Sequence, residues 1–331
     1  MRSWLETGDA NAPPAFHSFF QNIVFLGGDR RQIYAAKALA SLGIPVSVFG
    51  FSKEAADALP RVERPKDLCD FGTWVLPLGF CRDQNSLYTP LCEGIYAIDA
   101  LFSNLFEKTR LFHGGAKKAT PSGVAYVKNY AEREEFLIPN AVLTAEGAVA
   151  QILTLTGASL TGKSVAILGY GRIAKALAKQ LTALGAEVTV FARRSSARAE
   201  AEADGNCRAV LPLPLQANAL SGCSVVCNTV PAPILDSEAL ASLPSGALFL
   251  ELASLPGALT DDAMRFWQED TEKPKIRLVC ARGIPGQYAP KEAGEILASV
   301  LCLYAKEAIS DAENSPQKLT DPRGIQTGMG G

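Results

Sequence analysis

The stretch VAILGYGRIA at residues 165–174 decides the fold of this 331-residue chain. Its first four residues are apolar and predict a short buried strand, and the turn that follows opens an amphipathic helix over Ile173–Leu184. Gly169 allows the tight turn, Gly171 leaves room for a diphosphate against the backbone, and Ala174 keeps the helix close to the strand. The free N–H groups and the dipole of the helix then attract phosphate. The stretch therefore predicts a doubly wound, dinucleotide-binding Rossmann domain.

The end of the next strand indicates which nicotinamide dinucleotide to expect. About twenty residues after the turn, an acidic residue would bond the ribose 2′-hydroxyl of NAD. This chain has Ala192-Arg193-Arg194-Ser195-Ser196 there. Two guanidiniums and two hydroxyls fit a 2′-phosphate better than a ribose diol. NADP is therefore predicted, with NAD as the alternative; under a plainer interpretation the arginines are simply solvated.

An earlier βαβ pattern predicts a second α/β domain. Ile23–Leu26 is a short apolar run closed by Gly27 and Gly28, a helical pattern follows, and Val46–Phe49 is the next strand. Further candidate strands make an open parallel sheet of about five strands reasonable. A chain of this length also has room for two cores. We expect a flavodoxin-like N-terminal domain followed by the Rossmann domain.

Two long helices are expected to cross between these domains. Asn140–Gly157 is apolar and starts after Pro139, and a second helix beyond Pro290 returns to the first domain. The two ends of the chain lack a hydrophobic period and are predicted to be disordered. The predicted organisation is a tail at 1–20, a substrate domain at 21–140 plus 288–309, a crossover helix at 141–157, an NADP-binding Rossmann domain at 158–287 and a tail at 310–331.

The composition is that of an ordinary globular protein with small-molecule partners. The net charge is -2, without long runs of one sign, which provides no electrostatic footprint for nucleic acid or an anionic membrane. The eight cysteines show neither C-x-x-C pairs nor the density of a secreted disulfide scaffold, so no metal site is predicted. A signal peptide and an uninterrupted run of ~20 apolar residues are not expected either, which favours the cytoplasm.

Loops after parallel strands are where such sheets bind ligands. In the first domain, Asp29 would repel a phosphate, so this glycine turn is interpreted as a substrate grip in which Arg31 clamps a carboxylate; a structural ion pair is an equal alternative. For polar loop residues such as Asn228 and Thr229, two interpretations are equally supported: they bind a ligand, or they cap their loops. The predicted cofactor residues are Gly169, Tyr170, Gly171, Arg172, Ile173, Arg193, Arg194, Ser195, Asn228, Thr229, Val230, Pro231, Ala253 and Ser254, and the predicted substrate residues are Asp29, Arg31, Gly283, Pro285 and Gly286.

Several motifs, taken together and in order, resemble the A-subunit family of dipicolinate synthase. They are GGDRRQ (27–32), LTAEG (143–147), LGYGRIA (168–174), ARRSSA (192–197), NTVP (228–231), LASLPG (252–257) and GIPGQYAPKEAGEIL (283–297). The resemblance covers roughly residues 22–308, and its fold-level kinship is to the D-2-hydroxyacid dehydrogenases.

The resemblance implies oxidation of dihydrodipicolinate, an intermediate of lysine synthesis, to pyridine-2,6-dicarboxylate. It further implies a flavoprotein-like B subunit, with a place in the mother cell of a sporulating bacterium; a homo-oligomer is also compatible with it. Two positions depart from the family. Leu255 stands where a basic residue is common, and Arg282 stands where a small residue or proline is usual. Arg282 is therefore a candidate for the missing anion contact.

The scarcity of histidine helps to separate the related chemistries. A hydroxyacid dehydrogenase needs a histidine acid/base near the nicotinamide, but the chain has only His17, in the predicted tail, and His113, after a first-domain strand. Aromatisation of a dihydropyridine needs only hydride removal and loss of one ring proton. Glu146 and Lys291 are the candidates for proton transfer or carboxylate binding, with interdomain salt bridging as the favoured alternative. The remaining functional alternatives are another two-domain dehydrogenase of a hydroxy or keto acid and a nucleotide-binding partner protein without chemistry of its own.

Overall fold

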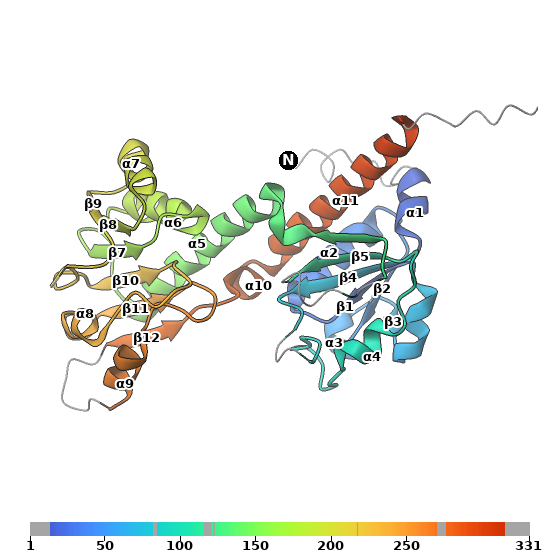
Figure 1. Cartoon of the computed structure of the whole chain (residues 1–331), viewed down its shortest axis with the longest axis horizontal. Helices are drawn as coiled ribbons and strands as arrows, with labels where there is room; N and C mark the ends of the chain where they lie inside the picture. The colour runs from blue at the N-terminus through green and yellow to red at the C-terminus, as the bar shows by residue number, and fades with distance from the viewer. Residues whose placement is uncertain are drawn as a thin grey trace, which may run out of the picture.

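The computed structural model describes residues 14–81, 85–115, 121, 123–216, 218–269 and 276–314. Two parallel six-stranded sheets, each covered by helices, form two α/β domains that lie side by side (Figure 1). Two long helices, α5 (Glu134–Thr156) and α11 (Pro290–Asn314), run between the domains. The predicted fold class, with two domains joined by two crossover helices, is confirmed.

The first sheet has the strand order β3-β2-β1-β4-β5-β6. The five strands from β2 to β6 follow the flavodoxin-like order, and the two-residue strand β3 extends the sheet beyond β2. Strands β3 and β6 were not expected from the sequence, because both are short and only partly buried, so they carry no apolar period. The strands are β1 (Ile23–Leu26), β2 (Val46–Phe49), β3 (Arg61–Val62), β4 (Thr73–Leu78), β5 (Arg110–Gly114) and β6 (Tyr126–Asn129).

The second sheet has the order β12-β11-β10-β7-β8-β9, which is the Rossmann order with its reversal between β7 and β10. The inner strands are buried on both faces, as parallel sheets covered by helices require. The edge strand β9 is partly exposed and was not predicted. The strands are β7 (Ser164–Leu168), β8 (Glu187–Ala192), β9 (Ala209–Pro212), β10 (Val225–Asn228), β11 (Leu248–Glu251) and β12 (Arg277–Cys280).

Short helices connect these strands and cover the sheets. In the first domain α2 packs on one face of the sheet with α11 beside it, so that the return helix completes the first core. In the second domain α6 and α7 follow β7 and β8 as βαβ crossovers. The helices are α2 (Arg30–Ser41), α3 (Lys53–Ala56), α4 (Ile98–Phe102), α6 (Arg172–Ala183), α7 (Ser195–Asp204), α8 (Ser237–Ala241), α9 (Asp261–Glu269) and α10 (Ile284–Tyr288).

Helix α5 begins at Glu134, six residues before the predicted start at Asn140, and Pro139 lies inside it. The first turn is held by packing: Phe136 is buried in the first core, 5.1 Å from the ring of Tyr130. The second half of α5 packs into the core of the second domain through small and aliphatic side chains, Ala145, Ala148, Val149 and Ile152. The helix is therefore shared by the two cores.

Among the described residues, α5 is the one helix long and apolar enough to cross a membrane, although the sequence was expected to contain no such segment. Half of that apolar stretch is buried inside the protein. A helix whose residues serve two cores is necessarily apolar over much of its surface. Its composition is thus accounted for by interdomain packing.

The prediction of disordered tails is wrong for residues 14–20 and 310–314, which are helical. Residues 14–20 form helix α1 (Pro14–Phe20), because three aromatic side chains, Phe16, Phe19 and Phe20, are buried in the first core. Phe19 lies edge-on to Tyr126, 5.9 Å away. At the other end α11 continues to Asn314, so residues 310–314 are helical as well. Residues 1–13 and 315–331 lie outside the described residues.

Candidate functional site

The glycine turn after β7 has the geometry that its sequence predicted. Gly169 adopts φ +96°, and a Cβ there would stand 2.5 Å from the hydroxyl of Thr229, so only glycine fits. A Cβ added at Gly171 would meet nothing within 4 Å, which leaves the backbone open to a ligand. Gly171 is also the N-cap of α6, whose first-turn N–H groups have no partner within the helix. The turn is a ready anion site.

A cavity of about 670 Å³ opens beside this turn. That volume lies within the range of small-molecule and cofactor sites. Eight of the predicted cofactor residues line it, and the others do not. The lining residues are Gly169, Tyr170, Gly171, Ala192, Arg193, Arg194, Ala197, Leu213, Pro214, Thr229, Val230, Pro231, Ala232, Pro233, Ile234, Asp236 and Thr260, so Arg172, Ile173, Ser195, Asn228, Ala253 and Ser254 are not among them.

Tyr170, between the two glycines, ties the turn to the next crossover helix. Its hydroxyl donates to Asp204 Oδ2 at 2.7 Å, at the end of α7. Burial, and then this hydrogen bond, raise the pKa of Tyr170, so the phenol stays protonated as the donor. Lys175 lies over the ring, 5.7 Å from its centroid. Tyr170 therefore fixes the turn against α7, whose N-cap is Arg194.

Arg172 is engaged elsewhere, although it was predicted to contact the cofactor. Its Nε donates to Glu134 Oε2 at 2.8 Å, at the start of α5. This ion pair joins α6 to the crossover helix α5. What remains available to a ligand at this position is the backbone of the first turn.

A buried carboxylate that the sequence reasoning missed organises the loops after β10 and β11. Glu251 is 4% exposed and accepts hydrogen bonds from Asn228 Nδ2 at 2.7 Å, from Ala253 N at 2.9 Å and from Ala258 N at 2.8 Å. The only sequence signal was an acidic residue closing the apolar strand 248–251. Asn228 and Ala253 thus position loops rather than line the cavity. Arg282 adds to this by donating from Nε to Ala253 O at 2.9 Å.

The predicted substrate grip in the first domain is an internal ion pair. Arg31 Nη2 lies 2.7 Å from Asp29 Oδ2, and Arg31 Nε lies 2.9 Å from Asp29 Oδ1. Burial acts to lower the pKa of Arg31, but the hydrogen bond and charge of Asp29 outweigh it and raise the pKa above its ordinary value. The guanidinium fork therefore already holds a carboxylate. The structural ion pair is the alternative that the structure favours.

The second domain meets this pair through α10. A Cβ added at Gly286 would stand 2.3 Å from Asp29 Oδ2, so a glycine is needed at this contact. Pro285 is buried in the same short helix, and Gly283 is its N-cap with φ +72°. The structure thus brings Asp29, Arg31 and Gly286 together where the two domains touch.

The two predicted proton-transfer residues do not converge. Glu146 is exposed on α5, and Lys291 is exposed on α11, where its Nζ lies 4.0 Å from Glu295 one turn further on. No ion pair joins them in the described part of the chain, so the interdomain salt bridge expected as their alternative is not formed either. Neither histidine lines the cavity: His17 is in α1, and His113 is buried at the end of β5.

The first-domain glycine turn is closed to phosphate. Gly28 N donates to Tyr88 O at 2.6 Å, and Arg31 N donates to Asp29 Oδ1 at 3.0 Å. These contacts use the N–H groups that an anion would need, in agreement with the interpretation that Asp29 excludes a second nucleotide.

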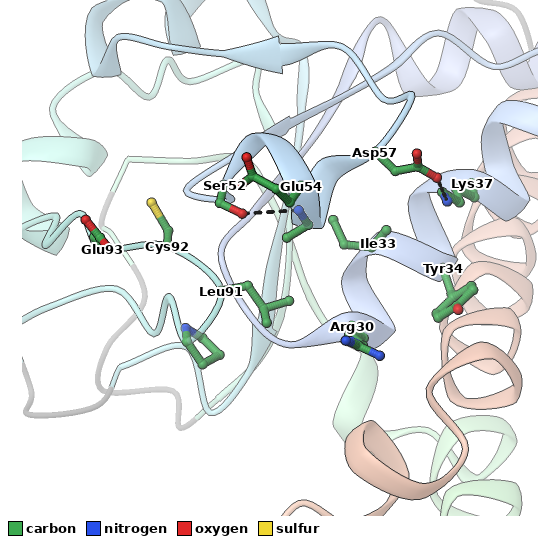
Figure 2. A pocket seen from close by; sticks show the side chains of 12 residues that line it. Arg30, Ile33, Tyr34, Lys37, Ser52, Glu54, Asp57, Leu91, Cys92 and Glu93 are labelled. Atoms are coloured by element: carbon green, nitrogen blue, oxygen red, sulfur yellow. Dashed lines mark hydrogen bonds and ion pairs between the residues drawn. The ribbon is translucent and has the colours of Figure 1, made fainter.

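A second cavity, of about 710 Å³, lies further out on the first domain (Figure 2). Figure 2 shows Arg30 on one side and Glu93 with Cys92 on the other, and Lys37 is already paired with Asp57 at 2.7 Å. The charges are mixed and no glycine turn opens into it. No cluster of three or more metal-ligating side chains occurs among the described residues.

Comparison with known proteins agrees with this geometry. Residues 22–131 match the family model of the N-terminal domain of the dipicolinate synthase A subunit, and residues 140–262 match that of the NAD binding domain of D-isomer specific 2-hydroxyacid dehydrogenases. The A subunit of dipicolinate synthase from Bacillus subtilis (strain 168) is 29% identical over 303 residues, which cover 84% of this chain and 94% of the relative.

Solved structures extend the comparison to the fold. The crystal structure of the dipicolinate synthase A subunit from Bacillus halodurans superimposes with a TM-score of 0.72 at 26% identity, covering 86% of this chain and 97% of that chain. D-lactate dehydrogenase from Escherichia coli superimposes with a TM-score of 0.56 at 12% identity, covering 88% and 96%. The second likeness concerns the fold alone. The resemblance identified from the sequence motifs is confirmed, and the second domain is that of a nicotinamide-dependent oxidoreductase.

Proposed function

Because the chain resembles the A subunit of dipicolinate synthase in both domains, we propose that it oxidises dihydrodipicolinate to dipicolinate with NADP. The observation that carries this proposal is the cavity of about 670 Å³ at the Gly169 turn, with Arg193 and Arg194 among the residues that line it. We also propose that the chain works in the cytoplasm of the mother cell of a sporulating bacterium, together with a flavoprotein-like B subunit. Its reaction would branch from lysine synthesis.

The reaction transfers a hydride from the dihydropyridine ring to NADP⁺ and releases one ring proton, giving dipicolinate, NADPH and H⁺. The bound nicotinamide supplies the hydride acceptor. The chain's own part is to hold the diphosphate on the first-turn amides of α6, to aim the cofactor's far end along the loops after β10 and β11, and to keep those loops in place through Glu251. In this proposal the Glu146 carboxylate takes the ring proton, and the Lys291 ammonium binds a substrate carboxylate.

Arg282 is proposed to hold a substrate carboxylate. It follows β12, at the same sheet edge as the loops after β10 and β11. Its Nε is fixed by Ala253 O, and it has no ion-pair partner within the described ranges, which leaves Nη1 and Nη2 for a bidentate contact. Arg31, by contrast, is neutralised by Asp29.

The test is product formation. The purified chain, alone and with a B subunit, is mixed with freshly generated dihydrodipicolinate and NADP⁺, and dipicolinate is followed by its ultraviolet absorbance. We expect dipicolinate together with an equal amount of NADPH. Product that requires the B subunit would place some catalytic groups in that partner, whereas turnover of hydroxy acids without dipicolinate would refute the proposed function.

A further inference from the structure

A third arginine stands at the end of β8, beyond the pair recognised in the sequence. Arg198, in the first half of α7, donates from Nη1 to Ala192 O at 3.0 Å and to Arg193 O at 2.8 Å. Both carbonyls belong to residues that line the nucleotide cavity, and so does Ala197, the neighbour of Arg198, whereas Arg198 itself is not among the lining residues. Its guanidinium therefore braces the loop at the end of β8, next to the cavity.

The acidic side chains on α7 that have partners are directed away from this loop. Glu200 pairs with Lys175 of α6, and Asp204 accepts the hydrogen bond from Tyr170. The strand itself ends in Ala192. Among the described residues at the end of β8, a ribose diol thus finds no carboxylate, and the acidic residue of the cavity lining is Asp236, from the loop before α8, whereas three arginines, Arg193, Arg194 and Arg198, gather at the strand end.

The three arginines differ in how firmly they are held. Arg193 and Arg194 are exposed, while Arg198 is half-buried and anchored through one nitrogen to two carbonyls. The two N–H groups of Nη1 satisfy those carbonyls, so Nε and Nη2 keep three N–H groups for an anion. A donor that is already fixed loses little entropy when a ligand arrives.

We propose that Arg198 is the residue that determines selectivity for NADP over NAD, by binding the 2′-phosphate from a preset position. The proposal rests on the NADP use proposed above and adds the group that enforces it. Arg193 and Arg194 close over the phosphate from solvent, while Arg198 supplies the fixed contact.

The test measures dissociation constants of NADPH and NADH, by calorimetry, for the wild type and Arg198→Ala. We expect the NADPH constant of the variant to rise about 10- to 100-fold, the loss typical of a charged hydrogen-bond partner, with the NADH constant unchanged within about twofold. A merely structural role would weaken both nucleotides equally. An equal loss, or no loss, would overturn the proposal.

Two further variants keep the result interpretable. Arg208→Ala removes an exposed arginine of the same domain that is paired with Glu187, and should leave the NADPH-to-NADH ratio as it is. If circular dichroism shows that Arg198→Ala does not fold, Arg198→Gln retains a donor to the carbonyls without the charge and should show the same selective loss. The wild type alone reports on the underlying function: equal affinity for NADPH and NADH would refute NADP use, and this inference with it.

Discussion

At the scale of single residues, two glycines constrain the site more tightly than the charged residues around them. One is Gly286, where the two domains touch, and the other is Gly169, in the turn after β7. Gly286 allows α10 to touch the Asp29–Arg31 pair, and Gly169 allows the turn to touch Thr229. In both cases a Cβ would meet a polar side-chain atom at 2.5 Å or less. The constraint is steric and lies between segments far apart in the chain.

Gly286→Ala should destabilise the protein by about 1–3 kcal/mol, because the added methyl overlaps Asp29 Oδ2 and forces α10 from the first domain. Urea unfolding followed by circular dichroism measures this change. Gly222→Ala is the matched control, since a Cβ there meets nothing within 4 Å, and its effect should stay within about 0.5 kcal/mol. Equal stability of the two variants would show that the interdomain contact is looser than described.

At the scale of elements, α1 shows how a short segment can belong to a core without a periodic signal. Phe20→Ala should cost about 3–5 kcal/mol, the usual loss for a fully buried phenylalanine. Thermal unfolding of Phe20→Ala beside the exposed-site control Ser18→Ala measures it, and the control should change stability by no more than about 0.5 kcal/mol. A Phe20→Ala variant as stable as the control would restore the interpretation of this segment as a tail.

The elements that the sequence predicted well are those with a local chemical reason. The strand, turn and helix around Gly169 follow from neighbouring residues, and so does the return helix after Pro290. The edge strands β3, β6 and β9 have two to four partly exposed residues, too few for a period. The start of α5 depends on the packing of Phe136 against Tyr130. This is a tertiary contact, which a local sequence pattern does not show.

The candidate site divides in the same way. The glycine turn and its arginines could be predicted, because phosphate binding has a local pattern. The role of Glu251 could not, because its three donors come from the end of β10 and from the loop after β11, which only the folded sheet brings together. The pairing of Arg31 with Asp29, rather than with a ligand, was left open by the sequence for the same reason.

At the scale of the whole molecule, the stability should depend on pH through His113. Burial lowers the pKa of His113 below its ordinary value of 6.5, so the folded protein binds this proton less readily than the unfolded chain. The stability that the neutral ring contributes is present above pH ~6.5 and is lost as the pH falls through the lower, folded-state pKa.

His113→Gln should therefore lose less stability than the wild type on going from about pH 7 to about pH 5. Scanning calorimetry at the two pH values checks this, with His17→Gln as the control, because the side chain of His17 is half-exposed on α1. An identical pH dependence of His113→Gln and the wild type would contradict the burial argument.

The proposed function of the whole molecule requires the turn after β7 to hold a dinucleotide. The most direct measurement is calorimetric titration of the folded chain with NADPH, alongside Gly171→Val, whose side chain would fill the open space beside the α6 amides. We expect saturable binding by the wild type and an affinity at least about tenfold lower in the variant. No binding by the well-folded wild type, or equal binding by Gly171→Val, would contradict this role of the turn.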